Sequence, residues 1–195
     1  MNTALRWRVI LLQVGLVGIL SFVAGFAFWA NSFSHGMVHD QLSAQQIYFP
    51  AAGSQALDPT QFPDLQQYAG QQVVNGDQAK AYADGFIGRH LIGIAGGQTY
   101  SQVSAASLAN PQDQKLAAQT QTLFRGEALR GLLLNAYGWW TIGQYAFYAA
   151  IGLTVAAAAV ALSLVFELWR WRVAAGQEQP ASAHQAAGAL HADPT

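Results

Sequence analysis

The sequence predicts an all-α fold in which two transmembrane helices flank a small helical extracytoplasmic domain. Three observations predict it: two long apolar stretches without charge, a charged fraction of only 10% over 195 residues, and no extended alternation of apolar and polar residues of the kind that marks strands. Soluble domains carry roughly 25% charged residues. Apolar residues make up 52% of the chain, which also excludes a disordered protein.

The first predicted span covers residues 9–30, which contain no charged residue. As a helix, about 22 residues extend roughly 33 Å, enough for a hydrocarbon core of about 30 Å. The second predicted span covers residues 142–168, and all but its last two residues lie in an uncharged stretch from Gly131 to Phe166. Two spans place both termini on the same side of the membrane.

The positions of the positive charges predict which side of the membrane holds the termini. Arginines flank the spans toward the chain ends: Arg6, Arg8, Arg170 and Arg172. By the positive-inside rule, residues 1–8 and 169–195 are expected in the cytoplasm and residues 31–141 outside it. Tryptophan rings prefer the headgroup level of a bilayer. All six tryptophans fall at predicted span ends: Trp7, Trp29, Trp139, Trp140, Trp169 and Trp171.

Both spans carry small residues at a helix-packing spacing. The pairs are four positions apart: Ser21 with Gly25, and Gly152 with Ala156. Small residues let helix backbones approach closely within a membrane. Two interpretations stay open: the two spans pack on each other through these faces, or the faces receive other membrane subunits.

The segment between the spans is predicted to be mostly helical. The first span is expected to continue outward to residue 47, and residues 50–76 are expected to form a loop because Pro and Gly punctuate them. A helix is expected over residues 78–94. Asn75 or Asp77 would cap its start, and Gly96 with Gly97 would end it.

A short helix over residues 101–108 is expected next. Asn110 followed by Pro111 predicts the start of a helix that runs unbroken into the second span, with Asp113 adding negative charge to its first turn. Residues 169–195 are expected to form a disordered cytoplasmic tail, because beyond Val173 the chain is rich in Ala, Gln and Ser and lacks aromatic residues.

Three of the five histidines make up the only candidate metal centre. His35 and His39 are four residues apart, which places both imidazoles on one helix face. His90 shares an apolar helix stripe with Phe86 and could complete a three-histidine site. The alternatives are two solvated histidines, and a core histidine at position 90 with one satisfied hydrogen bond or a role in pH sensing.

A second candidate site combines His90 with charged residues of the last predicted helix: Arg125, Glu127 and Arg130. Glu127 and Arg130 lie three apart on an apolar face, which predicts a pair buried against another helix near Asp84. The alternatives are an ion pair that sets helix register, or recognition of a lipid headgroup or partner carboxylate by the arginines. The same spacing predicts an interfacial ion pair between Glu167 and Arg170.

Several short motifs occur in a characteristic order. They are the stretch Gln41-Leu42-Ser43-Ala44 with Ile47, the run Ala81-Tyr82-Ala83 with Ile87 and His90, then Gly96-Gly97, Thr99-Tyr100 and Leu129-Arg130. In order and spacing the chain resembles a family of small actinobacterial two-span membrane proteins of unassigned function. The chain departs from that pattern at Gln98, where the family has lysine, and at Ser101-Gln102, where it has an acidic residue. The resemblance implies a bacterial cytoplasmic membrane.

Members of that family are often labelled aromatic ring-opening dioxygenases. That chemistry needs iron, typically held by two histidines and a carboxylate, and His90 is the only histidine here that belongs to the family pattern. The residues therefore do not predict an enzyme, and no cofactor is expected. The chain has no cysteine, which excludes thiolate metal sites. Its net charge of −1 does not favour binding to nucleic acid.

The leading functional prediction is a non-enzymatic membrane protein that acts as an accessory, assembly or stabilising subunit of a larger membrane complex. The expected partners are the lipid bilayer and other membrane subunits, with a homo-oligomer left open. Two alternatives remain: an extracytoplasmic module that binds or senses a lipid, metal or small ligand, and a metal-dependent enzyme built on His35, His39 and His90.

Overall fold

A computed structural model describes the backbone of residues 3–189 and the side chains of residues 4–174. Its described residues form helices, turns and loops without a β-strand, and an isolated antiparallel bridge joins Tyr48 to Gln72. The predicted all-α class is confirmed for this part of the chain.

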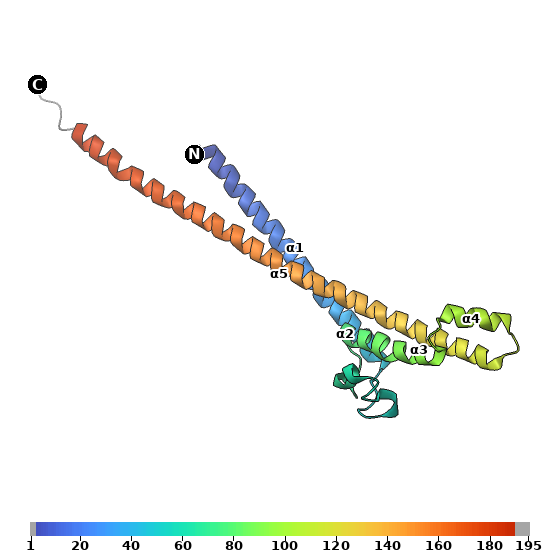
Figure 1. The fold of residues 1–195 in the computed structure, drawn as a ribbon. Coiled ribbons are helices and arrows are strands. Elements are labelled where there is room, and N and C mark those ends of the chain that lie inside the picture. Colours follow the sequence, from blue (N-terminus) through green and yellow to red (C-terminus); the bar gives the residue numbers. More distant parts are fainter. Residues whose placement is uncertain (1–2, 190–195) are drawn as a thin grey trace, which may run out of the picture. The chain divides into compact units, whose positions relative to one another are not determined.

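Figure 1 shows the elements in sequence colours, from α1 in blue to α5 in yellow through red. Their bounds are α1 Thr3–Gln45, the 3-10 helices η1 Gln55–Leu57 and η2 Pro63–Tyr68, α2 Gly76–Lys80, the π-helix η3 Ala81–Gly88, α3 Arg89–Ala95, α4 Tyr100–Ala109 and α5 Gln114–Ala189.

The two terminal helices are long and apolar enough to cross a membrane. The candidate segments are Ala4–Gln45 and Gln114–Ala174, with mean hydropathies of 2.4 and 2.3 in their most apolar windows. Only 11% of each window is buried within the protein. A core helix of a soluble protein would be mostly buried, so this exposure favours a lipid environment for both segments.

The chain divides into two compact units. We call Met1–Ala27 with Tyr148–Thr195 the span unit, and Phe28–Phe147 the central unit. The central unit contains residues 31–141, the range expected to form a domain between the spans.

In the span unit, one stripe of α1 is less exposed than the rest of the helix. Together with the matching stripe of α5 it forms a contact that we call the seam. The less exposed residues of α1 recur at alternating spacings of three and four: Ile10, Gln13, Val17, Leu20 and Ala24. The corresponding stripe of α5 is Leu153, Ala157, Val160, Leu164 and Glu167. This is the heptad spacing of helices that pack side by side. Ala24 and Ala157 are the most buried members, at 4% and 8% exposure, and Gln13 Nε2 donates to Ser163 Oγ at 3.3 Å.

The small-residue pairs predicted from the sequence do not lie in this seam. A Cβ atom added to Gly25 or to Gly152 would meet nothing within 4 Å. The alanines that do lie in the seam are neighbours of the predicted residues in the sequence, rotated by about 100° around the helix. The glycines therefore face outward.

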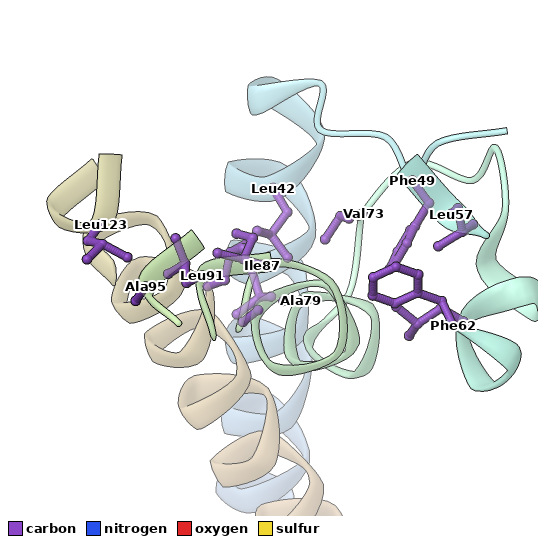
Figure 2. Close-up of a cluster of buried hydrophobic side chains, with 14 of the residues drawn as sticks. Leu42, Phe49, Leu57, Phe62, Val73, Ala79, Ile87, Leu91, Ala95 and Leu123 are labelled. Atoms are coloured by element: carbon purple, nitrogen blue, oxygen red, sulfur yellow. The ribbon is translucent and has the colours of Figure 1, made fainter. Parts of the chain in front are cut away.

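The central unit has the main hydrophobic core (Figure 2). Phe49, Leu57, Leu65 and Val73 from the loop region between α1 and α2 are nearly fully buried, at 0–2% exposure. Leu91, Ala95 and Leu123 extend the core to α3 and α5. The predicted loop is thus folded back, and the bonds Phe49 N to Gln71 O at 2.9 Å and Val73 N to Ile47 O at 2.8 Å hold its two ends together.

The helix predicted over residues 78–94 is confirmed as a continuous helical stretch through α2, η3 and α3. Asn75 caps it, accepting from Gln78 N at 2.9 Å, and Gly96 ends it in the left-handed conformation at φ +58°. Only glycine adopts that conformation without strain. The π-helical segment Ala81–Gly88 was not predicted, because the apolar periodicity does not reveal a widened turn.

Two predicted helix limits are wrong. Helix α5 begins at Gln114 and not at Pro111, because Asp113 provides the cap by accepting from Leu116 N at 2.9 Å. Asn110 instead ends α4, donating to Ala106 O at 3.0 Å. The predicted disordered tail, residues 169–195, is helical as far as Ala189. Ala, Gln and Glu extend an existing helix readily. Residues 190–195 of that prediction lie outside the described residues.

The ion pair expected between Glu167 and Arg170 is also absent from the described side chains. Arg170 lies over the ring of Phe166, with its guanidinium carbon 5.9 Å from the ring centroid. Glu167 lies on the inward stripe of α5, near Arg6 and Trp171.

Candidate functional site

The three candidate metal-binding histidines are not brought together. Among the described residues, no group of three or more His, Asp or Glu side chains is placed to hold a metal ion. The geometry therefore offers no support for the predicted set of His35, His39 and His90.

His35 is a packing residue at the contact between α1 and α5 in the central unit. Its ring stacks on Trp140 with centroids 3.7 Å apart, and its Nε2 lies 3.1 Å from Trp140 O. Since a carbonyl oxygen only accepts, Nε2 donates this bond and carries no free lone pair for a metal. Gly143 makes room for the imidazole, because a Cβ there would lie 2.7 Å from His35 Cδ2.

His39 and His90 have different surroundings. His39 is exposed and its Nδ1 lies 3.4 Å from an oxygen of its neighbour Asp40. His90 Nδ1 donates to Phe86 O at 2.8 Å, and the ring stacks on Phe62 with centroids 5.1 Å apart. The interpretation of His90 as a packed histidine with one satisfied hydrogen bond matches this geometry.

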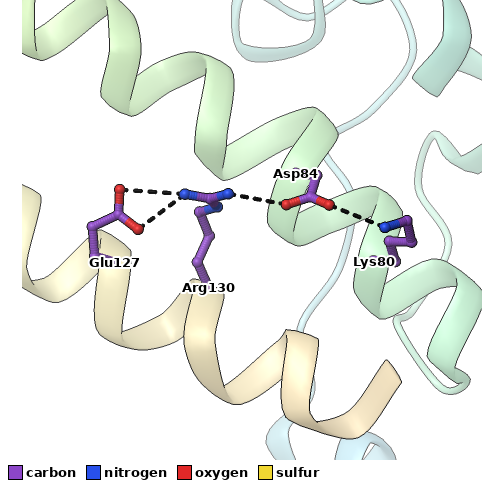
Figure 3. A network of polar contacts seen from close by, with 4 residues as sticks. All are labelled: Lys80, Asp84, Glu127 and Arg130. Atoms are coloured by element: carbon purple, nitrogen blue, oxygen red, sulfur yellow. Dashed lines mark hydrogen bonds and ion pairs between the residues drawn. The ribbon is translucent and has the colours of Figure 1, made fainter. Parts of the chain in front are cut away.

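The charged residues form a continuous network between η3 and α5 (Figure 3). Arg130 Nη2 donates to Asp84 Oδ1 at 3.1 Å, and its Nη1 donates to Glu127 Oε2 at 3.0 Å. Lys80 Nζ extends the network to the second oxygen of Asp84 at 3.4 Å. The predicted contact of Arg130 with Asp84 is confirmed. The expected burial is not, since Arg130, Asp84 and Glu127 keep 29%, 41% and 43% side-chain exposure.

The other two members of the predicted cluster lie outside this network. Arg125 donates to Gln121 Oε1 at 3.1 Å, one turn back on its own helix. The ring of His90 packs against Phe62 and Phe86. The structure therefore assembles Glu127 and Arg130 and leaves Arg125 and His90 apart.

Close backbone approach supports the Arg130 contact. Gly88 lies beside the guanidinium, since a Cβ there would be 3.5 Å from Arg130 Nε. That Nε is buried and has no hydrogen-bond partner among the described residues. The widened π-helical turn carries both Asp84 and Gly88, so it presents the carboxylate and the open backbone to the same side chain.

A second charge pair was missed by the sequence analysis. Arg89 makes a bidentate contact with Asp64, at 2.8 Å from Nη1 and 2.7 Å from Nη2. The two residues are far apart in the sequence and lie on α3 and η2, so no helical spacing signals the pair. Bidentate geometry makes it the best-formed ion pair described.

The pKa values of both aspartates are lowered. The Arg89 hydrogen bond holds the pKa of Asp64 below its usual value. For Asp84, partial burial acts to raise the pKa, but hydrogen bonds from Arg130 and Lys80 outweigh it. Both carboxylates are therefore charged at neutral pH, and the cations beside them are largely neutralised.

These charges line an open groove of about 450 Å³ in the central unit. Its charged and aromatic lining residues are Asp64, Tyr68, Asp77, Lys80, Asp84, Arg89 and Tyr137. Lys80 Nζ also lies 4.7 Å from the centre of the Tyr137 ring. Such alternating charge suits a small ligand or a partner segment that carries both signs.

No known family model matches the chain, and no curated protein and no solved structure shows significant similarity to it.

Proposed function

We propose that this protein is a two-span membrane protein of the bacterial cytoplasmic membrane that acts as an accessory, assembly or stabilising subunit of a larger membrane complex. Its central unit stands on the extracytoplasmic side, and both termini are cytoplasmic. It does so without catalysing a reaction.

An unoccupied glycine face on α1 carries the proposal. Gly15, Gly18 and Gly25 lie on one broad face, on average roughly 120° around the helix from the inward stripe of Val17 and Ala24. A Cβ atom added to any of the three would meet nothing within 4 Å. Phe22 lies on the same face and is 75% exposed. Helices associate in membranes through such close-approach surfaces, because lipid supplies no hydrophobic driving force between them.

The central unit supports the same conclusion. Large apolar side chains outside the predicted spans are more than half exposed: Ile92 at 63%, Leu108 at 81% and Phe124 at 58%. Exposed apolar surface on a chain with few charges favours contact with another protein over contact with water. The two units thus both present apolar surface that this chain does not cover.

The orientation rests on charge and aromatic placement. Arg6 and Arg8 precede the first span, and Arg170 and Arg172 follow the second. The positive-inside rule places such arginines in the cytoplasm.

The test compares two α1 variants in native membranes. A tagged wild-type chain, extracted in mild detergent, is expected to co-purify with a membrane protein in fixed stoichiometry, and Gly25→Leu is expected to lose it. Leu12→Phe adds bulk at a site that is 73% exposed and lies off the glycine face, so it should retain the partner. A wild-type chain that elutes as a lone monomer, or equal retention by both variants, overturns the proposal.

A second candidate function is an extracytoplasmic binding module, and the charged groove of the central unit favours it. Binding of a ligand there would use Lys80 and Asp84. A Lys80→Gln variant would then lose the ligand while keeping its far-ultraviolet spectrum, whereas Arg125→Gln, on another part of α5, would keep both.

A further inference from the structure

The two predicted spans meet at their cytoplasmic ends through tryptophan. In the span unit, the rings of Trp7 on α1 and Trp171 on α5 pack edge to face, with centroids 5.8 Å apart and an interplanar angle of 81°. This arrangement is a favourable aromatic geometry. Near this contact, Arg6 before the first span and Arg170 after the second line the same cavity.

A polar cavity opens beside this contact. It has a volume of about 260 Å³, and its lining includes Arg6, Glu167, Trp169, Arg170 and Trp171. A shallow apolar depression of about 10 Å³ adjoins it, and the two share Arg6, Glu167 and Trp171. The depression is too small to enclose a hydrocarbon chain, so it offers an apolar surface.

The apolar depression adds Trp7 and Ile10 to the shared residues. Trp7 lies just before the first predicted span, and Ile10 lies in its first turn. A polar cavity beside an apolar surface suits a lipid whose headgroup enters the cavity and whose hydrocarbon chain lies along that surface.

The charges in the cavity are not satisfied within it. Among the described side chains, neither Arg6 nor Arg170 forms an ion pair with a carboxylate. Arg170 covers the Phe166 ring, and no described side chain accepts a hydrogen bond from its guanidinium. Two guanidinium groups and the carboxylate of Glu167 leave one net positive charge.

We propose that this cavity binds one anionic glycerophospholipid whose headgroup carries free hydroxyls, as phosphatidylglycerol does. Arg6 and Arg170 donate to the phosphate, which suits the guanidinium fork. Glu167 accepts from the headgroup hydroxyls, and the start of an acyl chain lies along Trp7 and Ile10. The site rests on the membrane insertion in the proposed function and not on any partner subunit.

Each group in the cavity selects a part of this ligand. A phosphatidylcholine headgroup offers Glu167 no hydroxyl or amine donor. Phosphatidic acid also lacks headgroup hydroxyls, and its second titrating charge is repelled by Glu167. Free phosphate has no hydrocarbon to lie against Trp7 and Ile10.

The experiment is lipid retention by the full chain, purified from its membrane and exchanged into nanodiscs with equal amounts of phosphatidylglycerol and phosphatidylcholine. Native mass spectrometry counts the lipid that stays bound. Wild type is expected to retain one phosphatidylglycerol with a preference of about tenfold, which corresponds to about 1.4 kcal/mol. Equal retention of the two lipids overturns the proposal.

The Arg6→Gln and Arg170→Gln double variant is expected to lose that preference. Arg125→Gln removes an exposed arginine of the central unit and should keep it. A double variant that retains phosphatidylglycerol like wild type contradicts the phosphate assignment. Recovery in the membrane fraction is measured for each variant, so failed insertion is distinguished from failed lipid binding, and loss of a partner subunit leaves the lipid count unchanged.

Two further experiments distinguish a bound lipid from a bound free anion. A Glu167→Gln variant should bind phosphatidic acid better relative to phosphatidylglycerol, and an unchanged ratio contradicts the role of Glu167. Short-chain phosphatidylglycerol should displace the bound lipid, whereas inorganic phosphate should not. Displacement by inorganic phosphate at the same concentration would assign the cavity to a free anion and overturn the lipid proposal.

Discussion

Some glycines of the central unit are packed against side chains, whereas the described glycines of the span unit are not. In the central unit, Gly126 lies so close to Leu91 that an added Cβ would be 2.5 Å from its Cδ2, and Gly76 lies against Trp140 even more closely. In the span unit, Gly18 and Gly25 have nothing within 4 Å of an added Cβ. Among the described glycines, close packing against side chains is therefore confined to the central unit, where others such as Gly93 remain open.

This difference shows which unit fills its packing spaces with its own side chains. The central unit buries aromatic and aliphatic side chains and fills the spaces that its glycines open. The span unit buries mainly alanines, Ala24 and Ala157 among them, and leaves its glycine face open. The central unit is therefore expected to depend on its own side chains for stability, and the span unit on what surrounds it.

The largest expected effect comes from the core of the central unit. Phe49 is 2% exposed and packs against Tyr68 and Tyr82, with ring centroids 5.1 and 5.0 Å away. Phe49→Ala should lower the free energy of unfolding by about 3–5 kcal/mol. Urea unfolding in mild detergent, followed by near-ultraviolet circular dichroism, measures it. Tyr48→Ala, at a position that is 54% exposed, is the control, and an equal loss there would contradict the placement of Phe49.

The glycine contrast gives the next effect. Gly76→Ala places a methyl group against Trp140, and such overpacking should cost about 1–3 kcal/mol of unfolding free energy. Gly93→Ala adds the same group in α3 with nothing within 4 Å. It should be neutral or stabilise by about 0.5–1 kcal/mol, because glycine weakens a helix interior. If both variants unfold alike, the close approach at Gly76 is not present in solution.

A smaller effect is expected from the charge network. Asp84→Asn removes contacts with Arg130 and Lys80 that are partly exposed, so the loss at neutral pH should be about 0.2–1 kcal/mol. The pKa of Asp84 is lower in the folded than in the unfolded chain. Its stabilisation is therefore complete above the unfolded value near 3.8 and is lost as the pH falls through the lower folded value.

Unfolding measured against pH tests this sign. The gap between wild type and Asp84→Asn should close as the pH drops below 4, the range in which wild-type Asp84 becomes protonated. Asp40→Asn is a suitable control, since that carboxylate is 84% exposed and its ion-pair partner among the described side chains is its neighbour His39. A gap that persists or widens in acid would contradict the network.

The smallest effect on stability is expected in the span unit, where the glycines are not packed against side chains. Gly25→Ala in the purified chain should change its unfolding free energy by less than about 0.5 kcal/mol, because the added methyl meets nothing in the protein. Sedimentation and thermal unfolding in detergent measure it. A large loss of stability would mean that Gly25 packs within the chain and would remove the basis for an unoccupied face.

Part of the candidate site was predictable from local patterns. Glu127 and Arg130 lie one helical turn apart, and their contact follows from that spacing. Asp84 was expected near them because its helix had an apolar face to bury. The pair of Arg89 with Asp64 was not predictable, since it joins two elements whose relative position is set only when Phe62 and Leu65 pack into the core. The π-helical turn was missed for a similar reason: it places Asp84 and Gly88 by a shift that leaves the residue pattern unchanged.

The sequence by itself determined the helical class, the two long apolar helices and the glycine stop after Ala95. These follow from apolar length, from low charge and from the conformational freedom of Gly96, all of which are local properties. Tertiary structure alone decided which side of each helix is occupied. Gly25 and Ala24 are both small, and only the seam with α5 shows that Ala24 is buried while Gly25 faces outward. Periodicity gives the angle between two residues on a helix, but packing decides which angle meets a neighbour.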